Sequence, residues 1–151
     1  MNLAIDINDY NENCVFFHEA IKNTVIDNSN FIRCIYSNEL FTLNGIYIKF
    51  NLHISHIDKY FNKYKCNYER ESNKHVLELL AHIETSILHR KNIQNKRMIY
   101  KIREQINLNN IKLFTENVDN LINGYFILKI SGIWENENEY GITFKFMDVL
   151  V

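Results

Sequence analysis

Residues 126–146 read FILKISGIWENENEYGITFKF, a pattern that predicts two strands joined by an acidic, asparagine-rich turn. On both sides of the turn, apolar residues alternate with polar ones, which is typical of strands with one buried face. The apolar members are Phe126, Leu128, Ile130, Ile142, Phe144 and Phe146. Gly132 and Gly141 bracket the turn, and glycine inside a strand pattern often marks a bulge or a sharp bend.

Trp134, the only tryptophan, lies at the mouth of this turn. A straight strand with Ile130 facing the core would also turn Trp134 inward, because alternate residues of a strand share a face. A bulge at Gly132 would instead re-aim the indole outward. In a second interpretation, Trp134 and Tyr140 pack against each other across the turn. The sequence leaves both interpretations open.

Toward the N-terminus, residues 46–52 give the clearest strand pattern in the chain. The residues expected to face the core are Ile46, Ile48, Phe50 and Leu52, and those expected to face outward are Tyr47, Lys49, Asn51 and His53. Asn44-Gly45 tolerates positive φ at both central positions of a tight turn, and residues 41–43 continue the alternation before it. We therefore predict a hairpin at Asn44-Gly45, and another strand over the β-branched and aromatic residues 30–37.

The middle of the chain changes to a helical period over residues 72–91. Its apolar stripe consists of Val76, Leu79, Leu80, Ile83, Ile87 and Leu88. Ser72 or Asn73 could serve as the N-cap, and the cations Arg90 and Lys91 suit the C-terminal end of the helix dipole. Residues 58–72, before the stripe, read as a long loop or a frayed strand extension.

After the helix, residues 96–106 and 110–114 read as short strands with a turn near Asn109-Asn110. A second helix over residues 96–106 is the alternative. The predicted order is therefore strands, one helix, then strands, in a mainly β protein. A five-stranded Greek-key barrel with its helix between strands 3 and 4, the oligonucleotide-binding fold, has this order, and an α+β sheet domain is the alternative. We expect one domain over residues 1–151, with 1–29 as an irregular extension.

Composition favours a globular protein, since 46% of its 151 residues are apolar and 23% are charged. No apolar run approaches the roughly 18 residues that a membrane span needs, so we expect no membrane partner. The N-terminus lacks the basic start and apolar segment of a secretory signal. The three scattered cysteines suit reduced thiols. Together these features predict an intracellular, non-secreted protein.

The net charge of −1 hides a segregation of charge along the chain. Residues 58–103 hold eleven Lys and Arg against five acids, a net of +6, and the remaining six bases and thirteen acids give −7. A bipolar chain of this kind can bind a polyanion on one side. The alternative is a solvated helix with charged flanks.

No motif supports catalysis. The four glycines stand apart, so no phosphate-cradling loop is present. His75, His82 and His89 recur every seven residues on the predicted helix, about 10 Å apart, which is too far for shared metal coordination. We therefore expect no enzyme, no metal and no cofactor.

Exposed aromatic rings and cations remain as the prominent chemistry. Proteins hold single-stranded nucleic acid by stacking bases on aromatic rings and by tracking phosphates with Lys and Arg. The candidate residues are Tyr47, Lys49, Lys59, Lys63, Tyr64, Lys65, Arg70, Arg97, Lys101, Arg103, Lys129, Trp134, Tyr140 and Lys145. The sequence predicts that they share one furrow.

Two segments carry a family resemblance: KNTVIDNSNFIRCIYSNELFTLNGIYIKF (22–50) and ILKISGIWENENEYGITFKFMDV (127–149), together with IET inside the predicted helix. They resemble single-stranded-DNA-binding proteins of large eukaryotic DNA viruses, which are similar in fold to the corresponding proteins of short-tailed phages. The resemblance implies an oligonucleotide-binding barrel that coats unwound DNA during replication or recombination, without base specificity. It also implies other copies of the chain and replication proteins as partners, at a viral replication site in the nucleus or cytoplasm.

One departure from this family lies at the end of the chain. Phage and bacterial single-stranded-DNA-binding proteins typically end in a flexible acidic tail, whereas this sequence ends FMDVLV. The competing prediction is a structural or assembly protein, such as a virion component or scaffold dimer, whose strand edges pair between copies.

Overall fold

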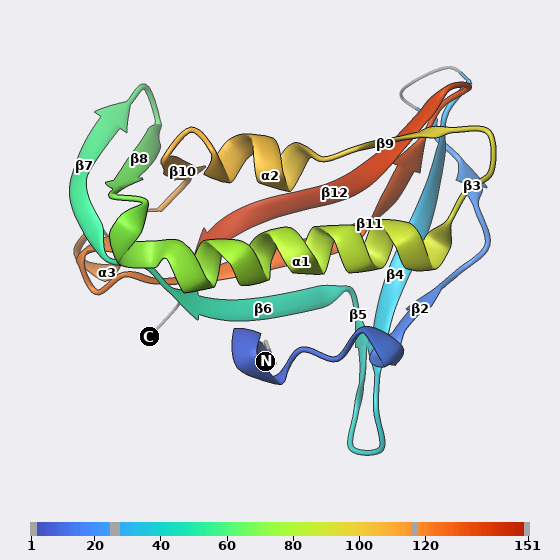
Figure 1. Ribbon diagram of the computed structural model, residues 1–151, viewed down its shortest axis with the longest axis horizontal. Helices are drawn as coiled ribbons and strands as arrows, with labels where there is room; N and C mark the ends of the chain where they lie inside the picture. Colours follow the sequence, from blue (N-terminus) through green and yellow to red (C-terminus); the bar gives the residue numbers. More distant parts are fainter. Residues whose placement is uncertain (1–2, 25–27, 116–117, 150–151) are drawn as a thin grey trace.

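The computed structural model describes residues 3–24, 28–115 and 118–149, which form two sheets and a helical layer (Figure 1). Among the described residues, nine strands form the large sheet: β1 (Ile5–Asp6), β2 (Val15–Phe17), β3 (Ile21–Lys22), β4 (Asn30–Ser37), β5 (Thr42–Asn44), β6 (Ile46–Asn51), β9 (Arg97–Ile99), β11 (Tyr125–Glu135) and β12 (Glu139–Asp148). The small sheet contains β7 (Ile54–Tyr60), β8 (Lys63–Tyr68) and β10 (Asn110–Leu113). The helices are α1 (Lys74–Lys91), α2 (Lys101–Ile106) and α3 (Asp119–Ile122), with 3-10 turns η1 (Ile7–Asp9), η2 (Glu12–Cys14) and η3 (Glu71–Asn73).

Strand β11 organises the large sheet. It pairs with β12 along its length on one edge, and on the other edge it pairs first with β6 and then with β4. Strand β9 runs parallel to β12, and β1 runs parallel to β6. The pairing does not close into a ring among the described residues, so the predicted five-stranded barrel is not formed. A mainly β protein with one long helix is confirmed, with open sheets.

The predicted hairpin at Asn44-Gly45 is wrong. Strand β5 pairs with β4, whereas β6 pairs with β11 and β1. Gly45 has φ of +105°, which lets the chain turn a corner so that β6 leaves β4 for a new neighbour. The actual hairpin joins β4 to β5, and the Asn38 side chain accepts hydrogen bonds from the backbone of Leu40 and Phe41 in its turn. The strand predicted over residues 30–37 is confirmed as β4.

Of the two interpretations of residues 58–72, the long loop is wrong and the strand extension is nearer, because most of the segment forms the β7–β8 hairpin. Cys66 and Tyr68 of β8 are buried in the core. The turn of this hairpin places Phe61 at φ of 55°, without the glycine that usually marks such a turn. Residues 96–106 combine both alternatives, since β9 is followed at once by α2.

Helix α1 confirms the predicted apolar stripe in outline and packs against the large sheet. Its buried side chains include Leu77, Leu80, Ile83, Ile87 and Leu88. Asn73 occupies the N-cap position, but its side chain makes no capping hydrogen bond to the first turn of α1. The side chain instead forms hydrogen bonds with the backbone of His53 and Glu69. At the other end Asn92 adopts a left-handed conformation, as is common for helix C-caps.

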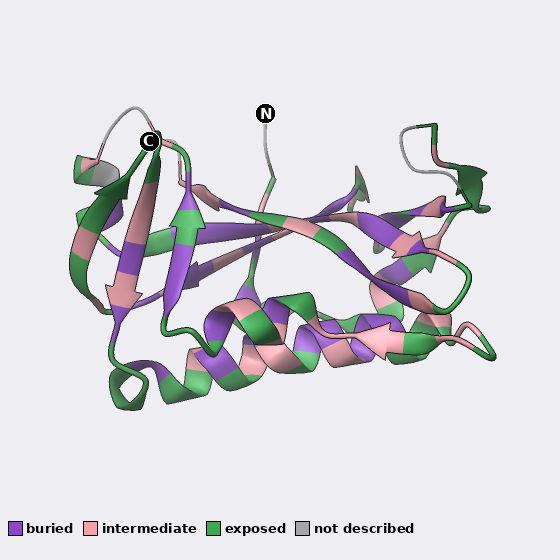
Figure 2. Cartoon of the chain, turned by 90° about the horizontal axis from the view of Figure 1, so that it is seen from above, coloured by how far each residue is buried: buried purple, intermediate pink, exposed green. Residues whose placement is uncertain are grey.

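Helices α1 and α2 lie together on one side of the large sheet, and the middle of the opposite face carries no described helix (Figure 2). We call this opposite surface the outer face. The described part of residues 1–29 is not an irregular extension, because β1, β2 and β3 add strands to the sheet. No helix of the described residues is long and apolar enough to span a membrane.

Candidate nucleic-acid interface

A β-bulge in β11 turns Trp134 to the outer face. Ile130 pairs with Phe144 and Gly132 pairs with Thr143, so one residue, Ser131, is extra on β11. After the bulge Ile133 is fully buried, and its neighbour Trp134 points the other way. Of the two interpretations that the sequence leaves open, the structure therefore has the bulge. Trp134 therefore lies half-buried on the outer face, outside the hydrophobic core.

Gly141, directly opposite Trp134, makes room for the indole. A Cβ atom built on Gly141 would lie 2.8 Å from Cζ2 of Trp134 and 2.9 Å from the carbonyl oxygen of Ile99. Contacts this short do not occur between real Cβ atoms and their neighbours, so only glycine leaves the ring its present place. Gly132 does the same for the Phe31 ring, whose Cζ would lie 2.7 Å from an added Cβ.

The strand registers arrange the outer face in cross-strand rows. Residues paired directly across a sheet project from the same face, so each row runs across several strands. The first row is Ile21, Phe31, Trp134, Gly141 and Ile99. The second row is Arg33, Gly132 and Thr143, and the third is Tyr47, Lys129 and Lys145. The fourth row is Asp6, Lys49, Ile127 and Met147, and the fifth is Asn51 and Tyr125.

These rows bring four aromatic rings and four cations together: Phe31, Tyr47, Tyr125, Trp134, Arg33, Lys49, Lys129 and Lys145. Three of the cations lie over rings, with Lys49 Nζ 5.2 Å from the Tyr125 centroid, Lys129 Nζ 5.7 Å from that of Tyr47, and Arg33 Cζ 5.9 Å from that of Phe31. None of the four cations forms an ion pair with a described carboxylate. Positive charge on this face is therefore available to a ligand.

The carboxylates nearest the face are engaged elsewhere. Asp6, at the edge of the fourth row, accepts hydrogen bonds from the backbone and side chain of Asn8. Next to Trp134, Glu135 turns inward and accepts from Lys96 at 2.8 Å and from Asn30 at 3.1 Å. The hydrogen bond from Lys96 is the main cause that lowers the pKa of Glu135. Glu135 thus adds little repulsion toward a polyanion, whereas Glu137 of the same turn is exposed.

Tyr140 is not part of the face. It is fully buried, and its hydroxyl donates to the carbonyl oxygen of Leu88 on α1 at 3.2 Å. Burial raises the pKa of Tyr140. The proposed packing of Trp134 on Tyr140 does not occur, because the two residues project from opposite faces of adjacent strands. The prediction that Tyr140 stacks on bases is therefore wrong.

The basic segment 58–103 does not form one track, so the prediction of a single furrow is wrong. Four of its candidate residues, Lys59, Lys63, Tyr64 and Lys65, belong to the small sheet. Arg70 and Arg103 line a cavity between the start of α1 and α2, on the helical side. Arg97 pairs with Glu139, and Lys101 pairs with Glu104. Lys101 lines a surface cavity together with Trp134.

Three residues of the face were missed from the sequence: Phe31, Arg33 and Tyr125. The alternation in residues 30–37 places Phe31 and Arg33 on the polar side of a strand, which was the available signal. Their importance arises from the pairing of β4 with the second half of β11, which sets Phe31 opposite Trp134. Local pattern does not specify that pairing.

A buried carboxylate positions α2 beside the sheet edge. Glu84 is fully buried on α1, and it accepts hydrogen bonds from the backbone N–H groups of Ile102 at 2.7 Å and Arg103 at 2.9 Å. Burial raises the pKa of Glu84, and the two backbone hydrogen bonds oppose this rise. Lys101, at the first position of α2, is thereby held near the Trp134 end of the face.

No known protein family, curated protein or solved structure gives a significant match to this chain. Among the residues that the structure describes, no group of three or more His, Cys, Asp or Glu side chains is placed to hold a metal ion. What the outer face offers a ligand is flat rings and ammonium or guanidinium groups, side by side. These are the groups that bind bases and phosphates in single-stranded nucleic acid.

Proposed function

We propose that the protein binds single-stranded DNA across the outer face, without sequence preference, in viral-type DNA replication or recombination. The observation that carries the proposal is the bulge at Gly132, which sets Trp134 among unpaired cations instead of in the core. The proposal is for binding and not for catalysis. It does not require a closed barrel, because one face of an open sheet supplies every contact.

The magnitudes support a useful affinity. A base stacked on an aromatic side chain contributes about 1–3 kcal/mol, and every base has a face to stack, so the contact tolerates any sequence. We assume that each of four cations neutralises one phosphate: Arg33, Lys49, Lys129 and Lys145. A plot of the logarithm of the binding constant against the logarithm of the salt concentration then has a slope of about −2.8. Affinity then falls roughly 50-fold between 50 and 200 mM salt.

The size of the face sets the length of the test ligand. Successive rows lie two residues apart along the strands, or about 7 Å, so the five rows span roughly 27 Å. At the stacked spacing of about 3.4 Å per nucleotide, this length holds at most about eight nucleotides. An octathymidine therefore matches the face.

Trp134 is the only tryptophan, so its fluorescence reports on the face alone. We expect octathymidine to quench it at 50 mM salt, salt to reverse the quenching, and a duplex of the same length to bind more weakly. An absence of quenching at low salt would contradict the proposal.

The alternative proposal is a structural or assembly protein. The specific observation in its favour is that β2 and β3, which both pair with β4, expose Phe16 and Ile21. Exposed strands of this kind can pair with the same strands of another copy. Light scattering with and without octathymidine separates the proposals, since a fixed oligomer that ignores the oligonucleotide favours assembly.

A further inference from the structure

The β7–β8 hairpin carries a second group of exposed rings at its tip. Tyr60 is 57% exposed and Phe61 is 82% exposed, and their rings meet edge to face with centroids 4.8 Å apart. Phe61 adopts φ of 55°, a conformation in which a bulky side chain is rarely found. Backbone strain of this kind is concentrated at binding sites, where a side chain must be presented in a particular direction.

Lysines surround this tip and the outward side of the small sheet. Lys63 Nζ lies 5.1 Å from the ring centroid of Phe114, which is itself exposed. Two more lysines, Lys65 and Lys112, are paired directly across β8 and β10. The chemistry is therefore the same as on the outer face, with aromatic rings beside cations.

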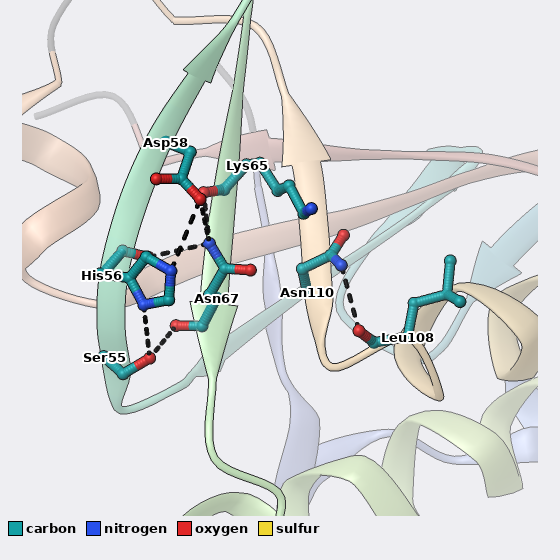
Figure 3. A network of polar contacts seen from close by, with 7 residues as sticks. All are labelled: Ser55, His56, Asp58, Lys65, Asn67, Leu108 and Asn110. Atoms are coloured by element: carbon teal, nitrogen blue, oxygen red, sulfur yellow. Dashed lines mark hydrogen bonds and ion pairs between the residues drawn. The ribbon is translucent and has the colours of Figure 1, made fainter.

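The carboxylate in this group, Asp58, lies opposite Lys65 in the register of β7 and β8 but forms no ion pair with it. Asp58 accepts a hydrogen bond from Asn67 at 3.0 Å and lies 3.5 Å from Nε2 of His56. Figure 3 shows the ammonium group of Lys65 pointing away from Asp58. No ion pair joins Lys63, Lys65 or Lys112 to any carboxylate in the described part of the chain.

The hairpin stands at one end of the outer face. Strand β7 begins at Ile54, three residues after Asn51 of the fifth row. In Figure 2 the hairpin, at the left, rises from the helical layer past the large sheet, so its tip lies on the same side as the outer face. The seven residues of β7 extend over roughly 20 Å. A nucleic-acid strand leaving the fifth row can thus reach the tip without crossing α1 or α2.

We propose, on the basis of the proposed function, that the tip of the β7–β8 hairpin is a second binding site for the same nucleic-acid strand. Tyr60 and Phe61 stack on bases, and Lys63 contacts phosphate. The site is occupied only by strands longer than the outer face. A membrane surface is the less favoured ligand, because the three exposed rings, Tyr60, Phe61 and Phe114, one of them carrying a hydroxyl, offer little apolar area for insertion.

The test compares two oligonucleotide lengths. Octathymidine fills only the outer face, whereas a 30-nucleotide oligothymidine also reaches the tip. The variant Tyr60→Ala/Phe61→Ala removes both rings, and Leu40→Ala is its matched control, since Leu40 is 89% exposed at the tip of the β4–β5 hairpin without a lysine beside it. Quenching of Trp134 measures the binding of both oligonucleotides, and circular dichroism verifies the fold.

We expect the double variant to bind octathymidine like the wild type and the 30-nucleotide strand at least tenfold more weakly. Leu40→Ala should change neither value. Should the double variant not fold, Lys63→Glu, at the start of β8, is expected to bind the 30-nucleotide strand more weakly and octathymidine like the wild type.

Unchanged affinity of the double variant for the long strand would overturn this second site while leaving the proposed function intact, and so would equal weakening for both lengths. Failure of the wild type to quench with either oligonucleotide would overturn the proposed function itself. The tip would be assigned to membranes instead if the wild type sediments with anionic phosphatidylserine vesicles, the double variant does not, and both bind the long strand equally well.

Discussion

Lys145 and Lys129 face each other directly across β12 and β11, so neutralising Lys145 should change stability and binding in opposite directions. Like charges placed directly opposite destabilise a sheet by roughly 0.2–1 kcal/mol. Lys145 has no ion pair among the described residues, and Lys129 keeps its contact with Tyr47 when Lys145 is replaced. Lys145→Gln should therefore raise the free energy of unfolding by a few tenths of a kcal/mol and the melting temperature by roughly 1–3 °C.

Binding should weaken in the same variant. Loss of one phosphate contact reduces the magnitude of the salt slope by about 0.7, from about 2.8 to about 2.1. At 0.1 M salt this corresponds to about a fivefold loss of affinity for octathymidine. Thermal unfolding and Trp134 fluorescence titrations at several salt concentrations measure the two effects on the same protein.

The control is Lys74→Gln, which removes the same charge from α1 on the helical side. We expect it to leave the salt slope unchanged. If Lys145→Gln keeps the wild-type salt slope while Lys74→Gln lowers it, the oligonucleotide lies along the helices and not on the outer face. A fall in melting temperature of Lys145→Gln would refute the stability argument.

Three further predictions concern single residues. Trp134→Ala should weaken binding of a labelled oligothymidine by about 1–3 kcal/mol in fluorescence anisotropy, whereas Trp134→Phe should retain most of the affinity. Equal losses in both variants would contradict stacking. Because the folded-state pKa of Glu84 is raised, its contribution to stability is present at low pH and is lost as pH rises from the ordinary value of about 4.3 through the raised pKa. Denaturant unfolding across this range should show the fall in wild type and not in Glu84→Gln; identical pH profiles would contradict it. Gly132→Ala places a Cβ 2.2 Å from the carbonyl oxygen of Ile32 and should cost at least about 1–3 kcal/mol of unfolding free energy, whereas Ser131→Ala should cost less.

Local pattern in the sequence predicts the strands well where one face is buried. The alternation of residues 46–52 matches the observed burial residue by residue, and the glycine inside the second alternating run correctly allowed for a bulge at Gly132. Both features depend only on near neighbours in the chain. The same is true of the apolar stripe of α1.

Pairing between distant strands is what the sequence does not specify. Gly45 supplies the positive φ that the Asn-Gly pattern predicts, but it serves a corner and not a hairpin, because β6 finds its partner 79 residues later in β11. The basic segment 58–103 fails for the same reason, since its residues divide between a hairpin, two helices and an edge strand. Charge that is continuous in sequence is scattered over the folded surface.

The division of the strands into two separate sheets predicts that the two sheets can unfold independently. Apart from Tyr125 and the bulge residue Ser131, the residues of β11 pair on both edges, so their amide hydrogens should exchange with solvent only when the whole large sheet unfolds. Among the described residues the small sheet pairs with no strand of the large sheet, and β7 and β10 are its two edges. Its amides can therefore exchange through a local opening of the hairpin, while the rest of the protein stays folded.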